Sequence, residues 1–206
     1  MSEPAKQKPL GQFLFKNVRF SYVHVDAPWK KKTDPIEKAK FGVAVLVPKN
    51  HPQLAAFKET LREVATAKWA DAYTGKKMKP IMCLRDGSEK DHKEGYDDSI
   101  MFFNASRSPK DGAPAVRDTN GMPISPTLPN GAVNPAYPYS GAWGHVLVKA
   151  WAQDNSDGQR INCSLEAIIK VKDDKKFDGG NEINVDEALS EVCDGAPVSE
   201  DDDLGI

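Results

Sequence analysis

A single segment of helical periodicity lies among several segments of strand-like alternation, and this imbalance limits the folds open to the chain. Between residues 52 and 73, apolar side chains recur at three- and four-residue spacing, and Gly75 follows where a helix would end. A parallel α/β sheet needs a helix after nearly every strand, so the pattern favours a small, mainly β Greek-key barrel with one amphipathic α-helix inserted between strands. Strand-like stretches cover 13–26, 40–47, 99–106, 145–153 and 161–171, with a short piece at 115–117.

Charge is unevenly divided along the chain. Residues 182–206 hold nine acidic residues and neither Lys nor Arg, whereas residues 1–181 hold 28 basic and 21 acidic residues. We interpret residues 1–12 as a flexible N-terminus, 13–181 as one folded domain with a long Pro- and Gly-rich loop at 118–144, and 182–206 as an acidic disordered tail. A basic body of this kind points to a polyanionic partner.

The residues that usually carry catalysis, metals or cofactors are sparse. Cys83, Cys163 and Cys193 form no closely spaced pair and the four histidines are scattered, so we expect free thiols, no metal and no cofactor. Phosphate-binding Gly-Lys loops, dinucleotide fingerprints and nucleophile elbows are missing from the sequence. Neither a secretion signal nor a membrane-length apolar run is visible, which predicts a soluble cytoplasmic protein without membrane contact.

Several segments place aromatic rings beside cations, the combination that binds single-stranded nucleic acid without sequence preference. A tryptophan precedes three lysines at 29–32, and outward positions of the strand at 145–153 carry a lysine next to a tryptophan. This pairing makes an oligonucleotide-binding (OB) fold the leading form of the barrel. The candidate nucleic-acid-binding residues are Arg19, Tyr22, Trp29, Lys30, Lys31, Lys32, Arg85, Lys90, Arg107, Tyr137, Tyr139, Trp143, Lys149 and Trp151.

Some of these assignments have two readings at the level of sequence. Trp151 either stacks on bases or is covered by the helix or the long loop. The cluster of Tyr137, Tyr139 and Trp143 either wraps over a bound strand or closes one end of the barrel. The sequence also leaves open binding of duplex DNA, and pairing of an edge strand across a homodimer.

The chain ends in the sequence EDDDLGI. Repulsion among the acids keeps such a segment unfolded, while its terminal apolar residues and free carboxylate can anchor in a basic-rimmed apolar pocket. We therefore expect the tail to bind partner proteins, or to fold back on the basic groove in competition with DNA. The predicted partner-binding residues are Asp201, Asp202, Asp203, Leu204 and Ile206.

Five segments, taken in order, carry a family resemblance. They are VRFSYVHVDAPW at 18–29, VAVLVPKNHP at 43–52, LRDGSEKD with FFNAS within 84–106, YSGAWGHVLVKAWAQ at 139–153 and IIKVKDDKKFDGG at 168–180. Together they resemble the phage-encoded single-stranded DNA-binding proteins with an OB-fold, related to the replication-coupled binding proteins of short-tailed phages. The resemblance implies protection of DNA in replication, recombination or repair within an infected host cell, without catalysis. It also implies that the acidic tail binds replication or recombination proteins. Ile206 stands where related tails commonly end in an aromatic residue.

Two other functions compete with this reading. A metal-dependent nuclease would use Asp86, Glu89 and Asp91, although two-metal catalysis needs carboxylates that converge from separate elements. A virion or interaction protein would have no DNA role at all.

Overall fold

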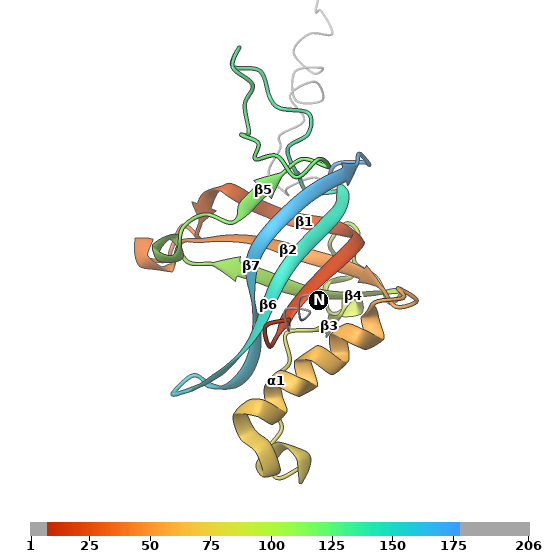
Figure 1. Ribbon diagram of the computed structural model, residues 1–206, viewed down its shortest axis with the longest axis vertical. Helices are drawn as coiled ribbons and strands as arrows, with labels where there is room; N and C mark the ends of the chain where they lie inside the picture. Colours follow the sequence, from red (N-terminus) through yellow and green to blue (C-terminus); the bar gives the residue numbers. More distant parts are fainter. Residues whose placement is uncertain (1–7, 178–206) are drawn as a thin grey trace, which may run out of the picture.

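A closed barrel forms the centre of the molecule in the computed structural model, which describes residues 8–177 (Figure 1). The predicted acidic tail and most of the predicted N-terminal segment therefore lie outside the described residues. Antiparallel pairing joins the strands in the order β4-β2-β1-β6-β7, and a parallel pairing of β4 with β7 closes the ring. The barrel strands are β1 (Gln12–Trp29), β2 (Lys40–Pro48), β4 (Ile100–Arg107), β6 (Trp143–Asn155) and β7 (Gly158–Lys172). This architecture confirms the mainly β barrel expected from the sequence.

Shorter elements extend or connect these strands. Strand β3 (Arg85–Asp86) adds to β4, and β5 (Ala115–Arg117) adds to β7 in parallel. Within residues 8–177, short 3₁₀ helices lie in the connections at Ile36–Lys38, Gly87–Lys90 and Pro109–Asp111. Among residues 8–177, no helix has the length and apolar character needed to cross a membrane.

One α-helix, α1 (Leu54–Thr74), packs against one end of the barrel (Figure 1). The ring of Phe57 lies 4.8 Å from that of Phe15 and 4.9 Å from that of Phe103, both of which point into the barrel. The helical spacing predicted from the sequence thus matches the face that is buried. Buried residues of α1 are Leu54, Phe57, Leu61, Val64, Ala65 and Trp69.

Gln53, which directly precedes α1, forms hydrogen bonds to the backbone at a bulge in β1. Between Phe15 and Val18 the pairing with β6 shifts, and Asn17 takes a left-handed φ of 56°. Gln53 accepts a bond from the Lys16 amide at 2.8 Å and donates to the Leu14 carbonyl at 3.0 Å. These bonds take the place of the strand-to-strand hydrogen bonds that are disrupted at the bulge. Backbone groups that are buried or partly buried need such partners.

The outer face of the sheet is also partly covered, which the alternating pattern of β2 did not reveal. Val43, Val45 and Val47 point into the barrel, yet Leu46 on the opposite face is only 1% exposed. It packs with Phe102 and Tyr96, and Tyr96 comes from the connection between β3 and β4. Strand β2 is therefore buried on both faces, because this connection folds over the sheet and makes a second small core.

Strand β7 departs from regular alternation halfway along. Strict alternation over 161–171 predicts that Ile161, Cys163, Leu165, Ala167, Ile169 and Val171 all point inward. The first three are buried, but Ile168 and Lys170 then take the inward positions in place of the last three. The cause is a bulge, since Leu147 pairs with Ala167 whereas its neighbour Val148 pairs with Leu165. One additional residue in β7 moves every later side chain to the other face.

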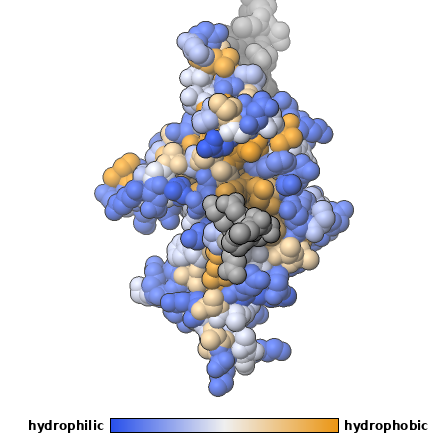
Figure 2. All heavy atoms as spheres, viewed as in Figure 1, coloured by the Kyte–Doolittle hydropathy of each residue, from blue (hydrophilic) through white to orange (hydrophobic). Residues whose placement is uncertain are grey.

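A vertical band of hydrophobic residues, flanked by hydrophilic ones, marks the middle of the molecular face in Figure 2. The view is that of Figure 1, in which β6 and β1 run through the same region. Leu10 and Leu14 are among the exposed large apolar residues of the chain, at 53% and 41% exposed. Single exposed apolar residues are ordinary on protein surfaces, so we assign no function to these two.

The contact between α1 and the barrel should dominate stability. Replacing Phe57, which is fully buried, by Ala is expected to lower the free energy of unfolding by about 3 to 5 kcal/mol, as lost burial and a residual cavity add together. Urea unfolding measures this loss. The adjacent exposed variant Lys58→Ala should change stability by about 0.5 kcal/mol or less. Equal effects of the two changes would show that α1 does not pack as described.

Candidate nucleic-acid interface

A groove crosses the outer surface of the barrel strands. Strand pairing sets His24 opposite Gly42, Gly42 opposite Ser106, Ser106 opposite Ser164, and Ser164 opposite Lys149. This row runs through β1, β2, β4, β7 and β6 in turn. In Figure 1 the connection that follows β1 and the hairpin of β6 and β7 both project towards the left. We call this surface the cross-strand groove.

The cross-strand groove has two adjoining halves. The first, about 280 Å³, lies over β1 and β2, and the second, about 320 Å³, lies over β4, β7 and the β6 hairpin. Both halves include Lys40, Asn104 and Ser106, so they are continuous. Gly42 and Ala44 contribute little or no side chain to the floor of the first half. A floor of small residues leaves room for flat groups to lie against the strands.

Aromatic rings stand at both ends of the cross-strand groove. Trp29, 52% exposed, stacks on His24 with ring centroids 5.3 Å apart and an interplanar angle of 13°. Burial lowers the pKa of His24 below its ordinary value of 6.5, although Asp26 opposes the shift, so the ring is neutral at neutral pH. At the other end Trp151 is 42% exposed and lines the second half. The reading in which Trp151 is covered therefore does not hold.

A strained backbone presents Tyr22 beside the first half. Its φ is 49°, in the left-handed region that side chains other than Gly, Asn and Asp rarely adopt. The residue lies where the pairing of β1 with β2 shifts between Ser21 and His24. Such a conformation costs about 1 to 3 kcal/mol and tends to occur at functional sites. The bulge directs the Tyr22 ring outward, where it is 42% exposed.

The ammonium group of Lys90 packs against the ring of Tyr22 and against two further aromatic rings. Its ammonium lies 5.4 Å from the centroid of Tyr22, 5.3 Å from that of Tyr96 and 4.8 Å from that of Phe102. Burial, reinforced by the charges of Arg85 and Lys93, lowers the pKa of Lys90. The attraction of three ring faces compensates part of the lost hydration of the cation. Lys90 thus packs against Tyr22 on the side of the second small core.

Lysines border the first half of the cross-strand groove. Lys30 and Lys31 line it from the connection after β1, and Lys32 is exposed next to them. The Lys30 ammonium donates to the Asp34 carbonyl at 2.7 Å. Lys40 faces Trp29 across the strand pair, and within residues 8–177 its ammonium has no ion-pair partner. Cations placed beside exposed rings suit a ligand that is both anionic and aromatic.

Two predicted arginines are engaged in internal contacts. Arg107 lines the second half of the groove and forms an ion pair with Glu166 at 2.6 Å, besides donating to the carbonyls of Asp111 and Gly112. Arg85 pairs with Glu89 and lies over the ring of Phe102 at 5.2 Å. Their charges still add to the local potential, but their geometry is fixed by the protein itself.

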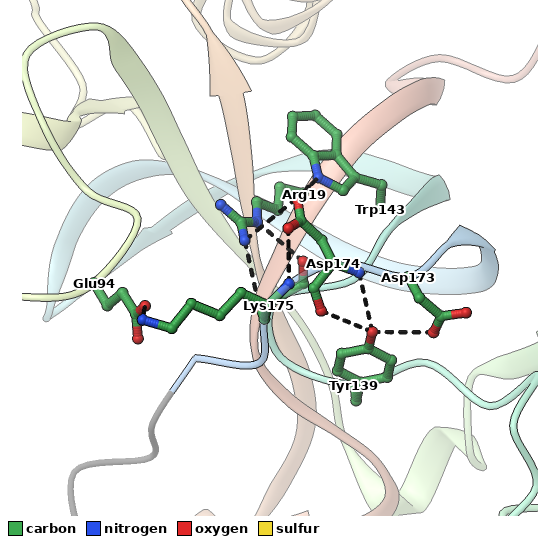
Figure 3. A network of polar contacts seen from close by, with 8 residues as sticks. Arg19, Glu94, Tyr139, Trp143, Asp173, Asp174 and Lys175 are labelled. Carbon is green, nitrogen blue, oxygen red and sulfur yellow. Dashed lines mark hydrogen bonds and ion pairs between the residues drawn. The ribbon is translucent and has the colours of Figure 1, made fainter.

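A separate polar network fastens the segment after β7 to the barrel (Figure 3). Asp174 accepts a bond from the Trp143 indole at 2.7 Å and lies 3.5 Å from the Arg19 guanidinium. Arg19 also donates to the carbonyls of Gly141 and Lys175. Tyr139 donates to Asp173 at 3.0 Å. Arg19, Trp143 and Tyr139, all predicted to touch nucleic acid, here hold elements of the protein together.

Residues 135–140 of the long loop lie against one end of the barrel. Tyr139 has the ammonium groups of Lys170 and Lys176 at 5.2 and 5.5 Å from its ring centroid. Tyr137 is half-buried against the core, and burial raises the pKa of its hydroxyl to about 12. Of the two readings of this aromatic cluster, the geometry favours closure of the barrel end.

The carboxylates considered for a nuclease are held by neighbouring cations and hydroxyls. Asp86 pairs with Lys49 at 2.6 Å and accepts bonds from the Ser88 amide and hydroxyl, which lower its pKa to about 2. Glu89 is bound by Arg85, and Asp91 is exposed. Within residues 8–177, no cluster of three or more His, Cys, Asp or Glu side chains is placed to hold a metal ion.

Several groove residues were not singled out from the sequence. Small and neutral side chains carry no recognisable signal for binding, and they become significant only because strand pairing brings them into one row. A strict alternation analysis of each strand would have placed most of them on the outer face. The additional lining residues are His24, Lys38, Lys40, Gly42, Asn104, Ser106, Gln153, Asn162 and Ser164.

The closed barrel with a parallel contact between its third and last strands, together with a basic and aromatic groove across its outer face, defines an OB-fold nucleic-acid-binding domain. A family model described as "Enterobacter phage Enc34, ssDNA-binding protein" matches residues 12–197, and the chain belongs to this family. The match ends before the last nine residues, which contain the predicted partner-binding positions.

Solved structures give the same relationship. The single-stranded DNA-binding protein of bacteriophage Enc34 in complex with ssDNA is 25% identical, with a TM-score of 0.61 over 85% of this chain and 97% of that one. Another structure of that protein has a TM-score of 0.60 and 25% identity over 90% and 97%. In fold alone, the chain resembles gp2.5 of bacteriophage T7, with a TM-score of 0.54 and 14% identity over 95% and 100%. No curated protein matches the sequence significantly.

The contact between Asp174 and Trp143 should depend on pH. Its hydrogen bond to Trp143, with those to Lys175 and the charge of Arg19, lowers the pKa of Asp174. The contact should therefore be complete above the ordinary carboxyl value of 3.8 and weaken only as the pH falls through the lowered value. The NMR signal of the Trp143 indole N–H, followed from pH 7 downward, reports this step.

Replacement of Asp174 by Ala should shift that signal at neutral pH and speed amide exchange at Phe177, whose amide donates to Ser140. A matched control is Asp157→Ala in the exposed turn between β6 and β7. If both variants leave exchange at Phe177 unchanged, the network does not anchor the segment.

Proposed function

We propose that this protein is a non-catalytic single-stranded DNA-binding protein that binds its ligand along the cross-strand groove. The observation that carries the proposal is the groove itself, in which exposed rings at both ends flank a floor of small residues bordered by lysines. Membership of the Enc34 family and the similarity to a relative solved with ssDNA support the same function.

In this proposal the two ends of the groove have different roles. Bases stack on Trp29 and Tyr22 at one end and on Trp151 at the other, each stack contributing about 1 to 3 kcal/mol. Lys30, Lys31 and Lys32, with Lys40, neutralise phosphates near the first end. Because every base has a ring face and every nucleotide a phosphate, this arrangement makes binding tolerant of sequence.

The remaining candidates take supporting roles. Lys149 lies at the end of the outward row beside Trp151 and extends the positive border. Arg85, Lys90 and Arg107 contribute charge from positions fixed by internal contacts, while Arg19, Tyr137, Tyr139 and Trp143 shape the barrel end and the segment after β7.

We further propose that the protein coats and protects single strands during phage DNA replication, recombination or repair in the cytoplasm of an infected host cell. In this proposal the acidic C-terminal residues recruit other replication or recombination proteins, or compete with DNA for the basic groove. The excess of acids over residues 182–206 supports both roles.

The exposed tryptophans provide the main test. Trp29→Ala and Trp151→Ala should each weaken binding of a labelled oligothymidine about 5- to 150-fold, with little change in thermal unfolding, because neither ring is in the core. Fluorescence anisotropy across a salt series measures the affinity. Leu14→Ala, a similarly exposed apolar position away from the groove, is the matched control.

Two further arms of the same assay separate the competing functions. A labelled duplex tests whether the lysines accept double-stranded DNA, and added Mg²⁺ or Mn²⁺ tests for cleavage. Salt-sensitive binding of the single strand without cleavage supports the proposal. Cleavage would favour the nuclease, and the absence of any binding would favour a virion or interaction protein.

The strained backbone of Tyr22 allows stability and binding to be separated. Tyr22→Asn should keep or raise the unfolding temperature, since Asn adopts the left-handed region more readily and the lost ring is 42% exposed. The same change should weaken oligothymidine binding about 5-fold or more through the lost stack. Tyr22→Phe keeps the ring and should retain affinity. A loss of both stability and binding in Tyr22→Asn would instead make the ring a structural element.

A further inference from the structure

Two cysteines that are 80 positions apart in sequence meet beside the seam that closes the barrel. The Sγ atoms of Cys83 and Cys163 are 3.5 Å apart. Cys163 lies on β7 opposite Ala105 of β4, in one of the two residue pairs that join these strands. Cys83 lies in the segment between α1 and β3, packed against the main core. The sequence alone gave no sign of this pair, because neither cysteine belongs to a closely spaced motif.

Backbone hydrogen bonds hold the two thiols near each other. The Ile81 amide donates to Gln159 at 3.0 Å and the Ile161 amide donates to Ile81 at 2.9 Å, so residue 81 pairs with β7 in parallel. Cys83 lies two residues beyond Ile81, and Cys163 lies three residues beyond Arg160, the partner of Ile81, so the two cysteines are brought side by side. A disulfide needs a sulfur separation of about 2.05 Å, so the sulfurs must approach by only about 1.5 Å.

The two thiols differ in access. Cys163 is buried at 3% exposed, and the hydrogen bond shared with Cys83, together with burial, raises its pKa. Cys83 is partly exposed. An oxidant from solvent therefore reaches Cys83 first. Cys163 lies in contact with Cys83 as a protonated thiol. This is the arrangement of a reacting and a resolving cysteine.

We propose that Cys83 and Cys163 form a redox-sensitive site at which a peroxide converts the two thiols into a disulfide that fastens the segment after α1 to β7. The Cys83 thiol gives up its proton, and the thiolate sulfur attacks one peroxide oxygen, so that the O–O bond breaks and the sulfur becomes a sulfenic acid. The leaving hydroxide takes up the proton released by Cys83 and departs as water. The Cys163 sulfur then attacks that sulfenic sulfur, and its thiol proton leaves with the hydroxyl group as a second water. Two thiols are oxidised and one peroxide is reduced.

The cross-link should stabilise the barrel. It closes a long loop, which restricts the unfolded chain, and it fixes β7 next to the parallel seam. We expect the unfolding temperature to rise by roughly 5 °C or more. Asn162 and Ser164, which flank Cys163, line the cross-strand groove, so the bond lies directly beneath that surface.

The test uses the full chain with Cys193→Ser, which leaves Cys83 and Cys163 as the only thiols. After treatment with hydrogen peroxide, the expected result is a mass loss of about 2 Da, a non-reduced peptide joining residues 83 and 163, and a higher unfolding temperature that dithiothreitol reverses. Cys83→Ser in the same background should show neither the bond nor the thermal shift.

Two outcomes would overturn the proposal. One is addition of oxygen to Cys83 without a cross-link, and the other is a cross-link that leaves the unfolding temperature unchanged or lower. Neither readout involves DNA, so failure here leaves the proposed binding function untouched.

Discussion

The parallel pairing of β4 with β7 is the contact on which the rest of the architecture depends. It joins Ala105 to Cys163 and Ser106 to Ser164, and it converts an open sheet into a closed ring. Closure places the inward residues of both strands in one core and their outward neighbours in one surface row. The cross-strand groove passes over this seam, so the proposed binding surface and the fold share the same few residue pairs.

The groove is open because other parts of the outer sheet are covered. Tyr96 and Phe102 bury Leu46 beneath the connection that follows β3, and Lys90 marks the edge of that cover beside Tyr22. At the barrel end, Asp174 accepts the indole N–H of Trp143, and part of the Arg19 guanidinium is engaged by Asp174 and by the carbonyls of Gly141 and Lys175. What stays exposed between these regions is a strip of small residues with rings at its ends. The extent of the cross-strand groove is thus set by the covered regions on either side of it as much as by its own side chains.

Sequence reasoning recovered the strands, the helix and the inward faces where alternation is regular, as in Val146, Val148 and Ala150. It failed beyond Leu165, because a bulge depends on the pairing of two strands and leaves no mark on either one alone. In the site, exposed tryptophans beside lysines were recognisable from composition. The structural use of Arg19 was not, since its partners lie at 141, 174 and 175, positions that only the fold brings near.

Barrel closure also sets an order on folding. Strand β1 pairs with β6, β6 pairs with β7, and β7 pairs with β4, so three contacts of the ring await the last strands of the domain to be synthesised. Until these strands emerge from the ribosome, β1 has an unpaired edge, the outer edge of β4 is paired only with the two residues of β3, and the aromatic rings that meet inside the barrel lack a closed core. A nascent chain of this protein therefore passes through a stage in which unpaired strand edges can pair with other chains. The yield of folded protein during rapid synthesis depends on how quickly β6 and β7 are made and close the barrel.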